Sequence, residues 1–301
     1  MKRNIYLKTI PPAEAVARVK ASIDREALIR EETIPSHEAS GRVLAHAVHA
    51  RYSSPTFHSA AMDGYAVNAR STFAAREGHP LTLKAGETCF AVNTGHPMPE
   101  GCDAVIMIEQ VVLDGGSVTI EAPAFPWQHV RRIGEDIVAT ELLFPRNHQL
   151  RPWDVGALLS GGIWDVPVWE RVTVRIIPTG DEVLDFTTHP DPGKGQVVES
   201  NSQMLAALAR ELGCVVERAA PVPDNPEALH QALKDSLDAG RHLTIFCAGS
   251  SAGSKDFTRA TLEKEGEILT HGIAAMPGKP SLLANCRGRL VAGAPGYPVS
   301  A

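Results

Sequence analysis

The sequence predicts a multidomain chain of the α/β and β classes, with a parallel-rich α/β domain, an all-β inserted domain and a discontinuous linking domain. The first observation is a strand-loop-helix pattern that occurs three times between Val172 and Asp256. Strands that alternate with helices favour a parallel sheet with ligands at the carboxyl ends of its strands. The second is the stretch from Tyr52 to about Leu143, where short β-rich runs alternate with turns rich in Gly, Pro, Asn and Asp.

The α/β domain is expected over residues 172–301, and its strands lead into loops that carry carboxylates. The strand candidates are Val172–Pro178, Cys214–Pro221 and His242–Cys247. The loops after them contain Asp181 and Glu182, then Asp224, then Asp256. Because parallel strands end at the same edge of a sheet, we expect these acids to lie together at a ligand site. The alternative is that each acid caps a helix and stays solvated.

Two helices are expected between these strands. One follows Asn201-Ser202 and ends at Gly213, and the other follows Asn225-Pro226, a capping residue and a first-turn proline, and ends near Gly240. Each helix has one apolar face, which we expect to pack on the sheet. The apolar positions are Met204, Leu205, Leu208 and Leu212 in the first helix, and Leu229, Leu233 and Leu237 in the second.

The linking domain is expected to be discontinuous, with residues 1–50 and 143–171 on either side of a β-rich domain at 51–142. Residues 13–30 have the period of a helix with one apolar face. The helical pattern returns in Trp153–Leu159 and ends at Gly161-Gly162.

Composition restricts the location and the partners. No apolar run approaches the roughly 18 to 20 residues that cross a membrane, and the amino terminus lacks the apolar core of a signal peptide, so we expect a cytoplasmic protein without a membrane partner. A net charge of −6 without a basic run argues against nucleic acid. Five cysteines without a CxxC pair argue against a disulfide framework or a zinc knuckle.

Four stretches rich in glycine or proline stand out, and none is a general nucleotide-binding motif. Neither GxGxxG nor GxxxxGK[ST] occurs, so neither a dinucleotide site nor a P-loop is predicted. The four stretches are Ser59–Ala66 (SAAMDGYA), Thr94–Asp103 (TGHPMPEGCD), Pro178–Glu182 (PTGDE) and Pro277–Pro280 (PGKP).

Together with GED at Gly134–Asp136, SNS at Ser200–Ser202 and KD at Lys255-Asp256, these stretches resemble the MoeA family in order and spacing. This family comprises the molybdopterin molybdenumtransferases of molybdenum cofactor synthesis, and the E domain of gephyrin is related to it. The resemblance covers about residues 13–301. It implies a linking domain, a β domain and an α/β domain similar to MogA, and we expect the family's C-terminal β domain to be missing from this sequence. We therefore expect either a truncated or a natural short form.

The resemblance implies an enzyme that takes adenylylated molybdopterin and molybdate, with Mg²⁺, and yields molybdenum cofactor and AMP. It also implies a homodimer and contact with the molybdopterin adenylyltransferase. An acidic cleft would repel the anionic pyrophosphate of the implied substrate unless a divalent cation stood between them, and oxygen ligands suit Mg²⁺. The implied metal ligands are Glu182, Asp224 and Asp256.

The other implied site residues come from several motifs. Lys279 lies in a rigid Pro-Gly-Lys-Pro turn that suits a phosphate or molybdate oxygen, although an ordinary surface lysine has the same pattern. Asp63, Thr94 and Asp136 are implied to close the cleft from the partner subunit, and by themselves the two aspartates also fit turns. The implied pterin-binding and oxyanion-binding residues are Gly249, Ser251, Gly253, Asp256, Gly278, Lys279, Pro280 and Ser300.

Three residues depart from the family pattern near these motifs. Ala248 stands where a glycine is usual, Met276 where a second lysine is usual, and Tyr297 where an asparagine is usual. Loss of the lysine removes a positive charge from a site for a dianion. The alternative function is therefore a non-catalytic molybdopterin-binding or scaffold paralogue.

Overall fold

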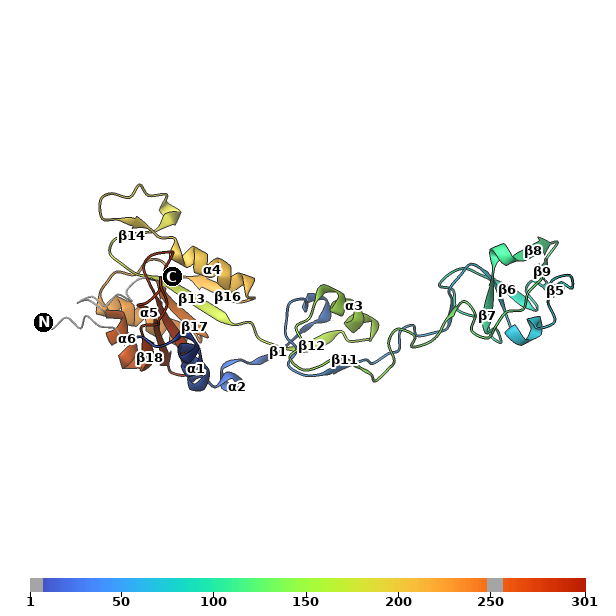
Figure 1. Cartoon of the computed structure of the whole chain (residues 1–301), viewed down its shortest axis with the longest axis horizontal. Helices are drawn as coiled ribbons and strands as arrows, with labels where there is room; N and C mark the ends of the chain where they lie inside the picture. Colours follow the sequence, from blue (N-terminus) through green and yellow to red (C-terminus); the bar gives the residue numbers. More distant parts are fainter. Residues whose placement is uncertain (1–7, 248–256) are drawn as a thin grey trace. The chain divides into compact units, whose positions relative to one another are not determined.

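The computed structural model describes residues 8–247 and 257–301 (Figure 1). These residues divide into two compact units. One unit contains the described residues up to Glu31 and those from Trp169 to Ala301, and the other is Glu32–Val168. None of the described helices combines the length and the apolar character needed to cross a membrane.

The first unit is built on a six-stranded sheet in the order β16-β13-β17-β20-β19-β18. The first four strands are parallel, and β19 and β18 add two antiparallel strands at the far edge. The predicted parallel-rich α/β domain is therefore confirmed, with strand ends shifted by a few residues. The strands are β13 Thr173–Pro178, β16 Val215–Arg218, β17 Leu243–Cys247, β18 Gly266–His271, β19 Leu282–Cys286 and β20 Arg289–Ala294.

Helices pack on this sheet (Figure 1), and α5 begins as its sequence predicts. The Asn225 side chain accepts a hydrogen bond from the Ala228 N–H at 2.8 Å, and Pro226 occupies the first turn. The apolar residues Leu229, Leu233 and Leu237 are buried in one core with β17, β19 and β20. The helices of this unit are α1 Pro12–Ser22, α2 Arg25–Leu28, α4 Asn201–Glu211, α5 Pro226–Asp238 and α6 Phe257–Glu265.

Helix α4 packs through a different face from the one its periodicity predicts. Met204, Leu208 and Leu212 are 41%, 53% and 74% exposed. Ala206 and Ala209 are buried against the sheet instead. The helix packs on the sheet as expected and Leu205 contacts this core, but the expectation was wrong for Met204, Leu208 and Leu212. Small side chains allow the helix to lie close to the sheet.

Helix α1 also lies in this unit, where its Arg18 Nη1 donates to the Leu269 carbonyl in β18 at 2.8 Å. The Asn285 side chain of β19 donates to the Ser22 carbonyl at the end of the same helix. The sequence placed residues 13–30 in the linking layer, whereas the structure groups this helix with the α/β unit.

The second unit contains the expected all-β insert, with two three-stranded antiparallel sheets in the orders β6-β4-β7 and β5-β9-β8. Val67, Leu83, Ile106 and Ile120 belong to its largest apolar core. The strands are β4 Gly64–Val67, β5 Leu81–Lys84, β6 Cys89–Val92, β7 Ala104–Met107, β8 Val111–Asp114 and β9 Ser117–Ile120.

A separate core joins chain segments on both sides of this insert. Leu44 and Val48 from the first segment pack with Phe144, Leu150 and Leu158 from the second. Helix α3, Pro152–Ser160, lies in this part. This core contains residues from both segments of the expected linking domain, and the division into three domains stays a prediction. The short strands of the chain are β1 Glu31–Pro35, β2 Val48–His49, β3 Ser59–Ala60, β10 Val130–Arg131, β11 Leu142–Phe144, β12 Asp165–Trp169, β14 Val183–Leu184 and β15 Val197–Val198.

A buried carboxylate stabilises the first turn of α3. Asp154 is 3% exposed, and its Oδ2 lies 2.7 Å from His148 Nε2, 2.9 Å from the Arg151 N and 3.1 Å from Arg151 Nε. Desolvation raises the pKa of Asp154, but the hydrogen bonds from Arg151 and His148 outweigh it and lower the pKa to about 2.

Asp154→Asn should therefore lower the free energy of unfolding by about 2 kcal/mol near neutral pH. The folded pKa of about 2 lies below the ordinary value of 3.8. The stabilisation is thus present above the unfolded pKa and is lost as pH falls through the folded pKa. Urea unfolding at neutral pH and near the folded pKa measures it, and the difference between wild type and variant should shrink in acid. The exposed Asp165→Asn is the matched control, with a change within about 0.5 kcal/mol. A difference that stays constant with pH would contradict the role given to the Asp154 charge.

Candidate functional site

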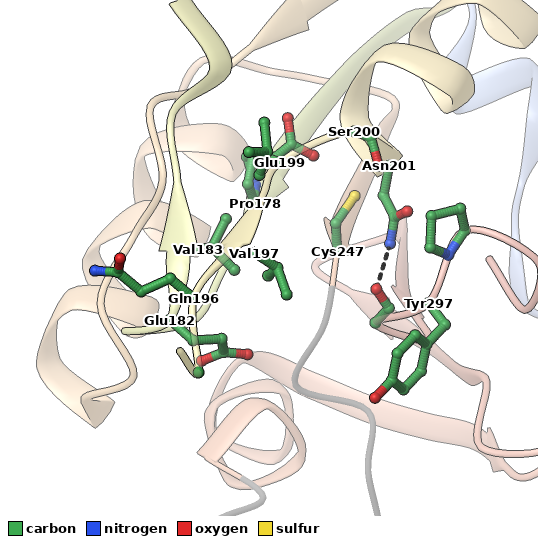
Figure 2. A pocket seen from close by; sticks show the side chains of 14 residues that line it. Pro178, Glu182, Val183, Gln196, Val197, Glu199, Ser200, Asn201, Cys247 and Tyr297 are labelled. Atoms are coloured by element: carbon green, nitrogen blue, oxygen red, sulfur yellow. Dashed lines mark hydrogen bonds between the residues drawn. The ribbon is translucent and has the colours of Figure 1, made fainter. Parts of the chain in front are cut away.

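A cavity of about 580 Å³ opens at the carboxyl ends of the parallel strands (Figure 2). Pro178 ends β13, Cys247 ends β17, and Gly296 and Tyr297 follow β20. Strands β14 and β15 form one wall, and the first turn of α4 forms another. This is the edge of a parallel sheet at which ligands bind, and the volume suits a small molecule.

The Thr-Gly-Asp-Glu motif sets the position of Glu182 at this cavity. Thr179 prolongs the sheet pairing, since its N–H and its hydroxyl both donate to the Cys247 carbonyl, at 2.9 and 3.1 Å. Gly180 follows at a φ of +133°, and a Cβ there would lie 2.9 Å from a Glu182 carboxylate oxygen. The glycine therefore leaves room for the Glu182 side chain, which lines the cavity.

The Ser-Asn-Ser motif connects α4 with the turn after β20. The Asn201 amide nitrogen donates to the Gly296 carbonyl at 2.9 Å (Figure 2). It also donates to the Pro295 carbonyl at 3.3 Å. Asn201 is only 6% exposed, so its amide fixes this turn from inside the protein. The motif thereby determines where Tyr297 lies at the cavity.

Glu199 is a cavity residue that sequence reasoning missed. It is 6% exposed, and it accepts the Ser202 N–H at 2.7 Å and the Ser202 hydroxyl at 2.5 Å. Arg218 Nη2 lies 3.4 Å from the same carboxylate. A negative charge is favourable near a helix N-terminus, so the position of Glu199 just before the N-cap Ser200 was an available signal.

Cys247 supplies a thiol to the cavity wall, but not a nucleophile. Its side chain is 3% exposed, and desolvation, with a smaller contribution from the charge of Glu199, raises its pKa to about 12. The thiolate is the reactive form of cysteine. Cys247 therefore stays a neutral thiol near neutral pH.

The Pro-Gly-Lys-Pro turn lies beside the carboxyl end of the described chain. Gly278 has a φ of +107°, and a Cβ at this position would lie 3.3 Å from the Ser300 carbonyl oxygen. Lys279 is exposed, and its carbonyl accepts the Ile273 N–H at 2.9 Å. The structure thus brings Gly278 and Ser300 together, whereas neither they nor Lys279 or Pro280 belong to the described cavity lining.

Two of the three predicted metal ligands, Glu182 and Asp224, are among the described residues. Glu182 faces the cavity, and the Asp224 N–H is held by Asp181 Oδ1 at 3.1 Å, outside the cavity lining. Asp256 lies outside the described residues, as do Gly249, Ser251, Gly253 and the divergent Ala248. Within the described residues, no group of three His, Cys, Asp or Glu side chains could hold a metal ion. Of the three predicted ligands, Glu182 alone is among the described residues that line the cavity, and its carboxylate oxygens are of the type that Mg²⁺ prefers.

The β-rich unit brings two of its three candidate residues together. Asp63 Oδ1 accepts the Thr94 N–H at 2.7 Å, and hydrogen bonds from the Thr94 backbone and side chain lower the pKa of Asp63. Asp136 is exposed, and its N–H donates to the Ser54 carbonyl at 3.0 Å. Gly64 has a structural role, because a Cβ there would lie 2.0 Å from the Ile106 carbonyl oxygen in β7.

Comparison with known proteins assigns both parts of the chain. Residues 10–162 match the MoeA N-terminal region (domain I and II), and residues 175–301 match a probable molybdopterin binding domain. The molybdopterin molybdenumtransferase of Synechococcus elongatus is 32% identical over 89% of this chain and 71% of its own length. That of Haemophilus influenzae is 33% identical over 90% of this chain and 69% of its own length.

The crystal structure of a molybdopterin biosynthesis MoeA protein from Pyrococcus horikoshii is similar over 97% of this chain and 76% of its own, with a TM-score of 0.82 and 29% identity. The cavity at the strand ends, the sequence motifs and these likenesses agree. The chain belongs to the MoeA family.

Proposed function

We propose that the chain acts in molybdenum cofactor synthesis, where it inserts molybdate into adenylylated molybdopterin and releases AMP in a Mg²⁺-dependent reaction. The observation that carries this proposal is the cavity at the carboxyl edge of the sheet, with Glu182 in its wall, in a member of the MoeA family. Its relatives named molybdopterin molybdenumtransferase support the choice of substrates.

The charges of the cavity support the need for a cation. Its described lining contains the carboxylates Glu182 and Glu199 and no lysine or arginine. Arg218 compensates Glu199, whereas Glu182 is exposed at the cavity. A pyrophosphate would be repelled by Glu182 unless a divalent cation lay between them. When bound there, Mg²⁺ would neutralise the pyrophosphate and polarise the bond to AMP.

The other candidate residues are proposed to bind Mg²⁺, to bind oxyanion or to act from the partner subunit. Asp224 and Asp256 complete the ligands of Mg²⁺, and Lys279 and Ser300 bind oxyanion with Gly249, Ser251, Gly253, Gly278 and Pro280. Asp63, Thr94 and Asp136 act from the partner subunit of a homodimer. Contact with the adenylyltransferase would deliver the adenylylated substrate. A cytoplasmic location also stays a prediction.

Glu182→Gln tests the proposed cation site. The amide keeps the shape of the side chain but loses its charge, so AMP release should fall by roughly 100-fold or more, and added Mg²⁺ should restore part of it. AMP is measured with purified protein, adenylylated molybdopterin, Mg²⁺ and molybdate. The control is Asp191→Asn in an exposed loop, which should keep wild-type activity. A wild-type protein without turnover, where a full-length relative works, would refute the proposed function.

A non-catalytic molybdopterin-binding role is the second candidate, and Met276 is the observation that favours it. This residue is 90% exposed and stands three positions before Lys279. A thioether there leaves Lys279 as the one cation of the Pro-Gly-Lys-Pro turn. This candidate predicts pterin binding without molybdate binding.

Met276→Lys distinguishes the two functions. Because residue 276 is exposed, the new lysine stays hydrated and should leave the melting temperature unchanged. If an oxyanion site lies around this turn, molybdate affinity should increase roughly tenfold, which equals about 1.4 kcal/mol. Calorimetry with molybdate measures this change. Ala274→Lys adds the same charge at another exposed position of the segment, and an equal gain there would show a general charge effect instead of a site.

A further inference from the structure

Arg218, the last residue of the edge strand β16, connects elements on both sides of the cavity. Its guanidinium binds Asp185 through two hydrogen bonds, from Nη2 to Oδ1 at 3.1 Å and from Nη1 to Oδ2 at 3.3 Å. Its Nε donates to the Ser202 hydroxyl at 3.0 Å, and its Nη2 lies 3.4 Å from Glu199 Oε2. The same guanidinium lies 4.6 Å from the centre of the Phe186 ring.

These contacts hold the wall formed by β14 and β15. The two strands are parallel and pair through only two residues each. Their hydrogen bonds run from the Val197 N–H to the Glu182 carbonyl and from the Glu199 N–H to the Leu184 carbonyl, each at 2.9 Å. Such a short pair is weak by itself. Asp185 follows β14 and Glu199 follows β15, so Arg218 contacts the residue after the carboxyl end of each strand.

Arg218 also compensates a buried charge beside the cavity. Glu199 is 6% exposed, and a buried carboxylate needs both hydrogen bonds and a counter-ion. Ser202 supplies two donors, and Arg218 supplies the positive charge. Without that charge, Glu199 would repel an anionic ligand from the cavity that it lines.

We propose that Arg218 is a positioning residue of this cavity. It holds the β14–β15 wall against α4 and shares its positive charge between Asp185 and Glu199, which lowers the repulsion of an anionic ligand. The part about the ligand rests on the proposed function, whereas the part about the wall does not. Arg218 itself is absent from the described cavity lining, and it therefore acts through Asp185, Glu199 and Ser202.

The experiment compares Arg218→Gln, Arg218→Lys and Asp185→Asn with wild type by three measurements: AMP affinity with Mg²⁺, amide hydrogen exchange at Val197 and Glu199, and melting temperature. Arg218→Gln should weaken AMP binding roughly tenfold or more and speed exchange at both amides. Arg218→Lys should lose less affinity, because it keeps the charge but lacks the planar fork. Asp185→Asn should speed exchange of the wall while Glu199 stays compensated.

A double variant separates electrostatics from structure. Adding Glu199→Gln to Arg218→Gln removes the uncompensated charge, so AMP affinity should recover in part although the wall stays loosened. A residue with only a structural role would give no such recovery. The control is Glu217→Gln on the preceding position of β16, which breaks an ion pair with Arg241 of 2.7 Å and should change neither AMP affinity nor wall exchange.

The outcomes decide separate parts of the inference. Wild-type exchange and wild-type AMP affinity in Arg218→Gln would overturn it, as would equal losses in Glu217→Gln. If Arg218→Gln does not fold, Asp185→Asn decides the role in the wall, and wild-type exchange there overturns it. If wild type binds no AMP, the proposed function fails, and faster exchange in Asp185→Asn still supports the positioning of the wall.

Discussion

The parallel hydrogen bonding of β13, β17 and β20 is the constraint on which the site depends. It brings Pro178, Cys247 and Ala294, far apart in the sequence, to one edge of the sheet. The backbone leaves the sheet after each of these strands, and residues at these points line the cavity. Thr179 continues the pairing beyond the strand, which places Glu182 at the opening. A parallel sheet thus creates a ligand site without needing a separate binding domain.

The charge of the cavity depends on the burial and the hydrogen bonding of its two carboxylates, Glu199 and Glu182. Glu199 is buried and fully bonded to Ser202 and Arg218, so it acts as part of the framework. Glu182 is exposed and remains available to a ligand. Only Glu199 pays the desolvation cost of burial, and hydrogen bonds from Ser202 together with the arginine on β16 offset that cost. The same balance of desolvation against hydrogen bonds gives Asp154 its low pKa in the other unit.

The β-rich unit uses its motif residues in two ways. Gly64 is required by the close approach of β7, which leaves no space for a Cβ. Asp63, its neighbour, is exposed and bonded to the Thr94 N–H, so the structure joins two motifs that lie 31 positions apart. One motif can therefore contain both a packing residue and a candidate for chemistry. Which residue has which role depends on what surrounds it and not on the motif alone.

Periodicity, capping residues and motif order determined the α/β class, the all-β insert and the family from the sequence by itself. These signals are local, since a helix start at Asn225 or a strand over 173–178 depends on residues within a few positions. Only the tertiary structure decided which face of α4 is buried, because Ala206 and Ala209 lie in the core with residues of β13 while Met204 and Leu208 are exposed. It also decided the role of Arg218, whose partners at 185, 199 and 202 meet it only when the chain is closed into the sheet. Long-range pairing of charges depends on burial and loop closure, and neither is encoded in the spacing of residues along one segment.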